Sequence, residues 1–195
     1  MMFYWIKNEI MNKSILLIFF IFIGLNTNAG FVKISDRGEA LKNNAKKWSC
    51  VLDTSTNLIW EVKISEEGLQ NHNNTYTWFD GVSGVENGEY SHNCYDGEMC
   101  NSHNYISKLN KKFICGLYNW RVPTFAELRS LIIYKDDEPL VDFRLFPYAK
   151  AKSYWSSSTS SSNSNIALDV PFFYGGTVGS DKSFDSYIRA VHNAE

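Results

Sequence analysis

Beyond residues 1–29, the chain lacks any apolar run long enough to cross a membrane as a helix, which takes about 20 residues. It also lacks an excess of one charge, because 19 basic residues are balanced by 21 acidic ones in a total of 195. This balance excludes the strongly basic surface by which many proteins bind nucleic acid or anionic membranes. Two sequence patterns are missing as well: the G-x-S-x-G turn of many hydrolases and the paired C-x2-C spacing of structural zinc sites.

The N-terminal segment has the order of a secretory signal peptide. Lys13 precedes an apolar core from Ile15 to Leu25, and the small residues Thr27 and Ala29 follow it. This order predicts a signal peptide of residues 1–29 that is cleaved after Ala29. An uncleaved N-terminal anchor is the alternative interpretation.

Translation is expected to start at Met11, because residues 1–10 add nothing that a signal peptide needs. The exported product is then a single domain of residues 30–195. It carries 17 basic and 20 acidic residues, a net charge of −3, because residues 1–29 hold two lysines and one glutamate. We expect it in the periplasm, at the cell surface or in the medium, with no membrane span after cleavage and no nucleic-acid partner.

All the cysteines lie in the mature domain: Cys50, Cys94, Cys100 and Cys115. An even number in an exported chain predicts two disulfides, and the sequence alone does not choose among the three pairings. We favour Cys94 with Cys100, which closes a small glycine-containing loop, and Cys50 with Cys115. A zinc site made of Cys94, Cys100, His92 and His103 is the disfavoured alternative.

Short strands dominate the first half of the mature chain. The segment Trp48–Lys63 alternates around a turn at Asp53–Asn57, which predicts a β-hairpin. Its expected apolar members are Val51, Leu58, Trp60 and Val62. Thr75–Asp80 is a brief aromatic strand, and Val82–Met99 is expected to be a long ordered loop held by cysteine. Tyr105, Ile106 and Leu109 recur at helical spacing and predict a first helix at 103–112.

The stretch NWRVPTFAELRSLIIY, Asn119–Tyr134, predicts the second helix. Thr124 and Glu127 form a capping box, and Pro123 requires the chain to enter the helix from an extended segment. The expected buried stripe consists of Phe125, Leu128, Leu131 and Ile132. Trp120, Arg121, Pro123, Thr124 and Glu127 are therefore interpreted as a structural junction, in which Arg121 and Glu127 form a buried ion pair.

The remainder of the chain indicates strands. Three strand-like runs, at 153–158, 166–174 and 186–192, follow the second helix, and Gly175–Gly176 suggests a tight turn. The polar stretch Ser156–Asn165 predicts an exposed loop. Two helices among short strands predict an α+β domain. The large side chains expected to fill its core are Trp60, Trp78, Trp120 and Trp155.

The motifs CVLDTSTNLIWEVK, YTWFD, CGLYNWRVPTFAELRSLI, YWSSS and YIRAV, in this order, resemble domain-of-unknown-function family 1566, the Lcl C-terminal domain. The resemblance covers about Lys47 to His192. It implies an exported or surface protein of bacteria, since the family is named after a collagen-like adhesin that binds sulfated glycosaminoglycans. This chain departs from that adhesin in having no Gly-x-y tract, and its net charge does not favour polyanionic glycans.

The helix start and the late strands are also similar to formylglycine-generating-enzyme-like domains, and this more distant resemblance implies a C-type-lectin-like fold. The oxidative chemistry of those enzymes is not carried over, because it uses a late cysteine pair and no cysteine follows Cys115. The histidines His72, His92, His103 and His192 have no catalytic sequence frame around them. The sequence therefore predicts a protein that is not an enzyme and has no cofactor.

A binding module is the expected function, with a glycan or a surface protein as partner. Aromatic and amide side chains on the late loops are the ligand-binding candidates: Asn163, Asn165, Tyr174 and Lys182. Calcium is an alternative through Asp136, Asp137 and Glu138, although a solvated acidic loop is the preferred interpretation. The sequence leaves the oligomeric state open.

Overall fold

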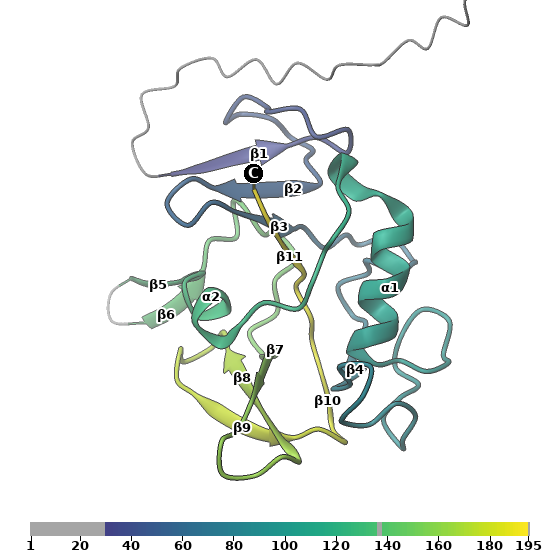
Figure 1. Cartoon of the computed structure of the whole chain (residues 1–195). Coiled ribbons are helices and arrows are strands. Elements are labelled where there is room, and N and C mark those ends of the chain that lie inside the picture. Colours follow the sequence, from purple (N-terminus) through teal and green to yellow (C-terminus); the bar gives the residue numbers. More distant parts are fainter. Residues whose placement is uncertain (1–29, 136–137, 195) are drawn as a thin grey trace, which may run out of the picture.

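The computed structural model describes residues 30–135 and 138–194, and these form an α+β domain of small antiparallel sheets with two α-helices (Figure 1). The strands are β1 (Phe31–Ile34), β2 (Cys50–Asp53), β3 (Leu58–Glu61), β4 (Tyr76–Thr77), β5 (Ile132–Lys135), β6 (Glu138–Val141), β7 (Ser153–Thr159), β8 (Ile166–Pro171), β9 (Val178–Asp181), β10 (Asp185–Ser186) and β11 (Val191–Asn193). The helices are α1 (Ser102–Lys112), the short 3-10 helix η1 (Ile114–Gly116) and α2 (Phe125–Arg129).

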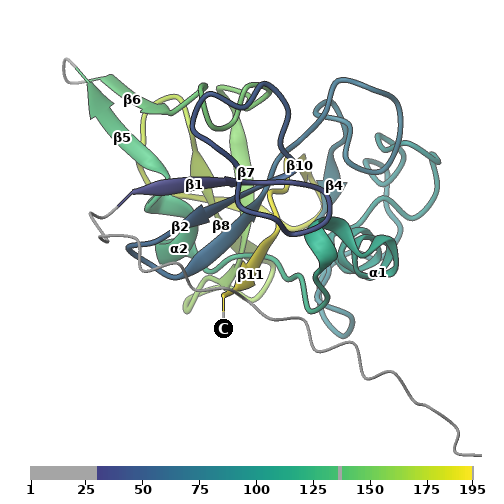
Figure 2. The ribbon, with the colours of Figure 1, turned by 90° about the horizontal axis from the view of Figure 1, so that it is seen from above.

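The two largest sheets occupy opposite ends of the molecule. One sheet has the order β1-β2-β3-β11 and another β7-β8-β9, while β5 pairs with β6 and β4 with β10. Figure 1 shows the four-stranded sheet at the top, the three-stranded sheet at the bottom and α1 along one side between them. The β5–β6 hairpin lies on the side opposite α1, both in this view and from above (Figure 2).

The predicted first hairpin is present, with β2 paired to β3 and Val51 opposite Trp60. Asn57 turns the chain with a φ of 56°, in the left-handed region that asparagine tolerates. The hairpin is buried on both faces: Val51 and Trp60 belong to one apolar cluster, whereas Cys50 and Ile59 belong to another. Successive side chains of a strand point to opposite faces, so β2 and β3 divide the core in two.

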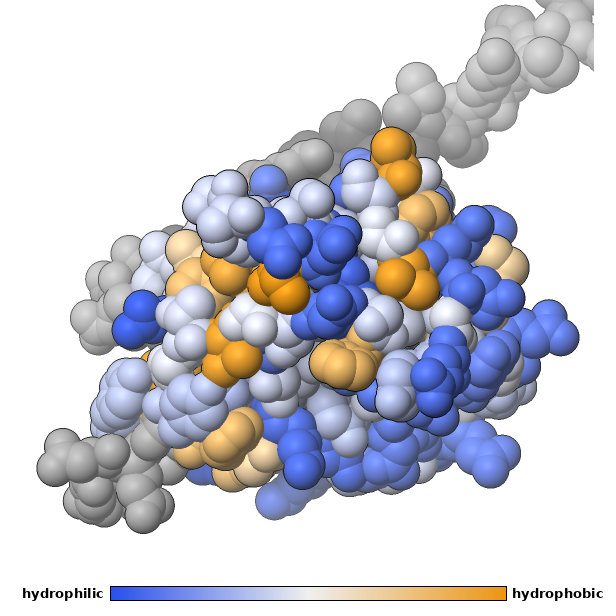
Figure 3. Space-filling view, turned by 90° about the horizontal axis from the view of Figure 1, so that it is seen from below, coloured by the Kyte–Doolittle hydropathy of each residue, from blue (hydrophilic) through white to orange (hydrophobic). Residues whose placement is uncertain are grey.

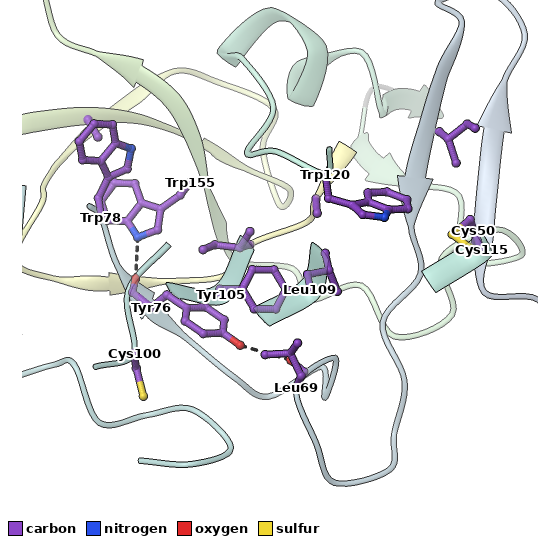
Figure 4. Close-up of a cluster of buried hydrophobic side chains, with 14 of the residues drawn as sticks. Cys50, Leu69, Tyr76, Trp78, Cys100, Tyr105, Leu109, Cys115, Trp120 and Trp155 are labelled. Atoms are coloured by element: carbon purple, nitrogen blue, oxygen red, sulfur yellow. Dashed lines mark hydrogen bonds between the residues drawn. A yellow bond between two sulfur atoms is a disulfide. The ribbon is translucent and has the colours of Figure 1, made fainter. Parts of the chain in front are cut away.

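The four tryptophans predicted to fill the core do so, each with an exposed fraction of 3% or less. Trp60 belongs to the cluster around α2, and the other three belong to the cluster around α1. Trp155 donates from Nε1 to the carbonyl oxygen of Tyr76 at 2.7 Å, which Figure 4 shows beside the ring of Trp78. The buried indole nitrogen of Trp155 thus links β7 to β4.

The first helix agrees with the sequence prediction, with Tyr105 and Leu109 buried. The second is shorter than predicted, because α2 ends at Arg129 and Ile132 begins β5. The expected buried residues Leu128, Leu131 and Ile132 are all in the core, but only the first lies in the helix. The run of Ile132, Ile133 and Tyr134 favours a strand, since β-branched and aromatic side chains pack well on a pleated surface.

The prediction of an exposed loop at Ser156–Asn165 is wrong for its first part. β7 extends to Thr159, and Ser156 is fully buried with its hydroxyl donating to the carbonyl oxygen of Leu168 at 2.6 Å. The carbonyl of Ser156 also accepts from Nε1 of Trp78 at 2.7 Å. A serine whose polar groups are all satisfied can occupy the core, so composition alone misplaced this segment.

Both favoured disulfides are present, Cys50–Cys115 and Cys94–Cys100. Cys50–Cys115 joins β2 to η1 across 65 residues, and both its residues are buried in the cluster around α1. Cys94–Cys100 closes a ring just before α1. Among the residues that the structure describes, no helix has the length and apolar character needed to span a bilayer.

Candidate functional site

A cavity of about 220 Å³ lies between α1 and the loop closed by Cys94–Cys100, and we name it the α1 cavity. Its lining residues are Leu69, Tyr76, Cys94, Tyr95, Asp96, Met99, Asn104, Tyr105, Lys108 and Lys112. Figure 4 shows Leu69, Tyr76, Cys100 and Tyr105 gathered in this part of the core. Tyr76 and Tyr105 form the buried floor, with ring centroids 4.7 Å apart.

The rim of the α1 cavity combines an exposed aromatic ring with polar groups. Tyr95 is 63% exposed and stands on the disulfide loop. Lys108, on α1, forms an ion pair with Asp96 of that loop. Asn104 donates from Nδ2 to the carbonyl oxygen of Met99 at 3.1 Å, which ties the loop to the first turn of the helix. The rim therefore offers a ring face, hydrogen-bonding groups and both charges to one ligand.

Behind the floor, a buried polar cluster fixes the position of Tyr105. The Tyr105 hydroxyl donates to Glu61 Oε1 and accepts from Lys63 Nζ at 2.6 Å, and this Nζ lies 3.1 Å from the same Glu61 oxygen. Burial lowers the pKa of Lys63 to about 8, against the opposing effect of the Glu61 carboxylate. Burial also raises the pKa of Tyr105 well above its ordinary value, with Glu61 acting in the same direction. The three side chains are buried, and their hydrogen bonds fix the Tyr105 ring in the cavity floor.

The Trp120–Glu127 junction connects three parts of the fold, as the sequence interpretation requires of a scaffold. Arg121 donates from Nη1 and Nη2 to the two carboxylate oxygens of Glu127, both at 2.7 Å, and from Nη2 to Asn193 at 2.6 Å. The capping box of Thr124 and Glu127 is complete. The hydrogen bond from Arg121 lowers the pKa of Glu127. The ion pair is half-buried and not buried as predicted, because it lies where α2 meets the sheet edge at Asn193.

The four candidate ligand residues do not converge on one site. Asn163 and Asn165 are exposed on the β7–β8 loop, whereas Tyr174 lies beyond the opposite end of β8. Lys182 is only 4% exposed, and its ammonium lies 3.7 Å from the centroid of the Trp78 ring. The expectation of a solvent-facing Lys182 is therefore wrong, since the cation–π contact draws its side chain into the core.

Each histidine contacts a ring or a loop carbonyl. His72 stacks on Tyr148 with centroids 5.3 Å apart, His103 meets Phe79 edge to face, and His192 meets Trp120 in the same manner. His92 Nδ1 lies 3.0 Å from the carbonyl oxygen of Gly97. The sequence favoured exposed loop residues at these four positions. His92 fits that interpretation, whereas His103 is exposed on α1 and His72 and His192 are half-buried.

The disulfide decides against the zinc alternative. Cys94, Asp96 and Cys100 carry ligand atoms within 4.8 Å of one another, but the two sulfurs are bonded to each other and offer no thiolate. His103 meets Phe79 edge to face and is not part of this group. The calcium alternative rests on Asp136 and Asp137, which lie outside the described residues, as does the side chain of Glu138.

A second depression of about 190 Å³ lies at the base of the β5–β6 hairpin, and we name it the hairpin groove. Its lining residues are Val141, Phe143, Ala149, Lys150, Ala151, Phe172 and Phe173. Phe143 and Phe173 are each more than half exposed. Sequence reasoning missed both depressions, since no sequence motif marks the residues that line them.

Comparison with known proteins shows to which protein family the chain belongs. No curated protein and no solved structure matches the sequence significantly. The family description that does match, over residues 49–192, is the Lcl C-terminal domain, and the match takes in both disulfides, both helices and the α1 cavity. With nearly all of the described fold inside that match, the chain belongs to the Lcl C-terminal domain family.

Proposed function

We propose that this domain is an exported, non-catalytic binding module of the bacterial surface and that it recognises a glycan through the α1 cavity. The observation that carries the proposal is the rim, where the exposed ring of Tyr95 stands beside Asp96, Asn104 and Lys108. An aromatic face packs against the C–H groups of a sugar, and carboxylate, amide and ammonium groups bind its hydroxyls.

The dimensions of the α1 cavity support a ligand that enters only in part. Its volume of about 220 Å³ is below the ~300 Å³ at which pockets for whole small molecules begin. One terminal unit of a longer chain fits such a depression, and the remainder extends over the exposed rim. Two disulfides and the predicted signal peptide support an exported location.

A C-type-lectin-like arrangement is part of this proposal. Small antiparallel sheets, two helices and two disulfides are compatible with it, and the resemblance of the helix start and late strands to lectin-like domains supports it by analogy. The glycan site that we propose differs from the late-loop residues that the sequence suggested. Asn165 and Lys182 are neighbours through a backbone hydrogen bond of 2.9 Å, but the Lys182 side chain is buried and Tyr174 lies beyond the opposite end of β8.

A glycan array tests the proposal, using the full chain expressed for export and purified in oxidised form, with calcium and with chelator. We expect specific hits that weaken at least tenfold in Tyr95→Ala. Tyr134→Ala is the matched control, since Tyr134 is 61% exposed but lies on β5, across the molecule from α1. A blank array for a correctly oxidised protein would reject glycan recognition, and equal loss in both variants would reject the α1 cavity.

Protein binding is the second candidate, and the hairpin groove is the observation that favours it. Phe143 and Phe173 expose apolar area at its two sides. Figure 3 shows one face of the molecule, on which hydrophobic residues are separated by hydrophilic ones among the coloured residues. Pull-down with Phe143→Ala against wild type tests this candidate: capture of the same partners by both proteins would reject a role for the groove.

A further inference from the structure

The two disulfides differ in their access to solvent. Cys50, Cys100 and Cys115 each have an exposed fraction of 1% or less, whereas Cys94 is only partly buried. A thiol reduces a disulfide by direct attack on one sulfur, so access to that sulfur controls the rate. Cys94 is therefore the more accessible cysteine of its disulfide, with an Asp96 carboxylate oxygen 3.2 Å from its sulfur, while the Cys50–Cys115 pair is buried at both ends.

The surroundings of Cys100 favour its departure as a thiolate. The backbone N–H of Cys94 donates to Cys100 Sγ at 3.1 Å. Cys100 also directly precedes Asn101, the N-cap of the 11-residue helix α1. Hydrogen bonding and the positive end of a helix both stabilise a thiolate, and a stabilised thiolate leaves faster.

The ring closed by this disulfide is fixed at one end and strained. Cys100 is anchored by its own N–H, which donates to Ser91 at 3.0 Å, and by its carbonyl, which accepts from Thr77 at 2.9 Å. Met99 has a φ of 45°, in the left-handed region that a side chain other than glycine rarely occupies. Loss of the covalent closure would leave Cys100 in place and allow segment 94–99 to relax.

We propose that Cys94–Cys100 is a reducible disulfide that controls the α1 cavity, and that its reactant is a low-molecular-weight thiol or the thiol pair of a reductase. The attacking thiolate bonds to the Cys94 sulfur as the bond to Cys100 breaks, and the Cys100 thiolate takes a proton from water. A second thiol then releases Cys94 as a thiol. Two thiols are oxidised to one disulfide, and the protein gains two electrons and two protons.

Reduction removes one wall of the cavity. Tyr95, Asp96 and Met99 all line it from the ring. Once the sulfurs separate, non-covalent contacts of the ring remain among the described residues: the ion pair of Asp96 with Lys108 and the hydrogen bonds to Met99 from Asn104 and between His92 and Gly97. The reduced form has an open, mobile rim. The reductive step stands on its own, whereas its effect on glycan recognition rests on the proposed function.

The test treats the full, oxidised chain with increasing reduced glutathione under native conditions, traps free thiols by alkylation and maps them by mass spectrometry. We expect Cys94 and Cys100 to be alkylated at glutathione concentrations that leave Cys50 and Cys115 unmodified. Simultaneous alkylation of all four, or earlier alkylation of Cys50 and Cys115, would overturn the proposal.

Hydrogen exchange measures the consequence without any glycan. Faster exchange is expected at 94–99 after selective reduction, with β2 and β3 unchanged, and the Cys94→Ser/Cys100→Ser variant should exchange in the same way without reductant. Unchanged exchange at 94–99 would overturn control of the cavity. A glycan found on the array should bind the reduced protein at least tenfold more weakly. A blank array rejects the proposed function alone, because alkylation and exchange still decide the reductive step.

Discussion

Arg189 donates from Nη1 to the carbonyl oxygen of Glu61 at 2.7 Å, although 128 positions separate the two residues. The Glu61 carboxylate accepts in turn from the N–H of Ala190 at 3.0 Å. These bonds hold the chain that leads into β11 beside β3 and so complete the four-stranded sheet. The guanidinium lies 4.5 Å from the Phe146 ring centroid, so this fully buried side chain packs against the cluster around α2.

Glu61→Gln should lower the free energy of unfolding by about 3–5 kcal/mol, because it leaves the buried Lys63 ammonium without its counter-charge. Urea unfolding followed by tryptophan fluorescence measures the change. The Glu61→Gln/Lys63→Met double variant should recover part of the loss, since neither charge then remains buried. A loss below ~1 kcal/mol in the single variant would contradict this account.

Because the pKa of Lys63 is shifted in the folded protein, the free energy of unfolding should depend on pH above about pH 8. Its ordinary value is 10.5 and burial lowers it to about 8 in the folded protein. Between these values the unfolded chain binds more protons, so stability rises with pH, by up to about 3 kcal/mol across the window. We expect the difference in unfolding free energy between wild type and Lys63→Met to change between pH 8 and 10.5. A constant difference over this range would show that Lys63 titrates normally.

Glu127→Gln should destabilise the protein by about 1–2 kcal/mol, since it weakens the bidentate contact with Arg121 and the capping box. The pKa of Glu127 is lowered from 4.5, so its contribution is present above pH 4.5 and is lost as pH falls through the lower folded value. Thermal unfolding at pH 7 and pH 3 should show a smaller effect of the substitution at pH 3 than at pH 7. Glu66→Gln is the control, because Glu66 is exposed in the loop after β3.

Removal of Cys50–Cys115 should cost more stability than removal of Cys94–Cys100. The first closes 65 residues and the second 6, and loop-closure entropy predicts losses of about 4 and about 2 kcal/mol. Urea unfolding of Cys50→Ala/Cys115→Ala and of Cys94→Ala/Cys100→Ala measures the two losses of unfolding free energy. A larger loss of unfolding free energy on removal of Cys94–Cys100 than on removal of Cys50–Cys115 would contradict this prediction.

The elements near strong local signals were predictable. Thr124 and Glu127 sit three residues apart after a proline, and this spacing alone specifies the start of α2. The end of α2 was not predictable, because Leu131 and Ile132 fit either a helix stripe or a strand, and the pairing of Ile132 with Val141 on β6 decides for the strand. Ser156 was misplaced for the same reason, since its hydroxyl is satisfied by Leu168 in a neighbouring strand.

The candidate site depended on tertiary structure more than the fold did. Tyr95, Asp96 and Lys108 carry no motif, and they meet only because Cys94–Cys100 folds the loop back onto the first turns of α1. Lys182 was a ligand-binding candidate because it flanks the late strands, and its contact with the Trp78 ring explains its burial.

The sequence by itself determined the family, the cysteine count, the first hairpin and the capping box, because each depends on the order and spacing of neighbouring residues. The tertiary structure decided the two-sided burial of β2 and β3, the cluster of Glu61 with Lys63 and Tyr105, and the α1 cavity. These features require contacts between residues distant in the chain, whose energies depend on burial and mutual distance and not on local pattern.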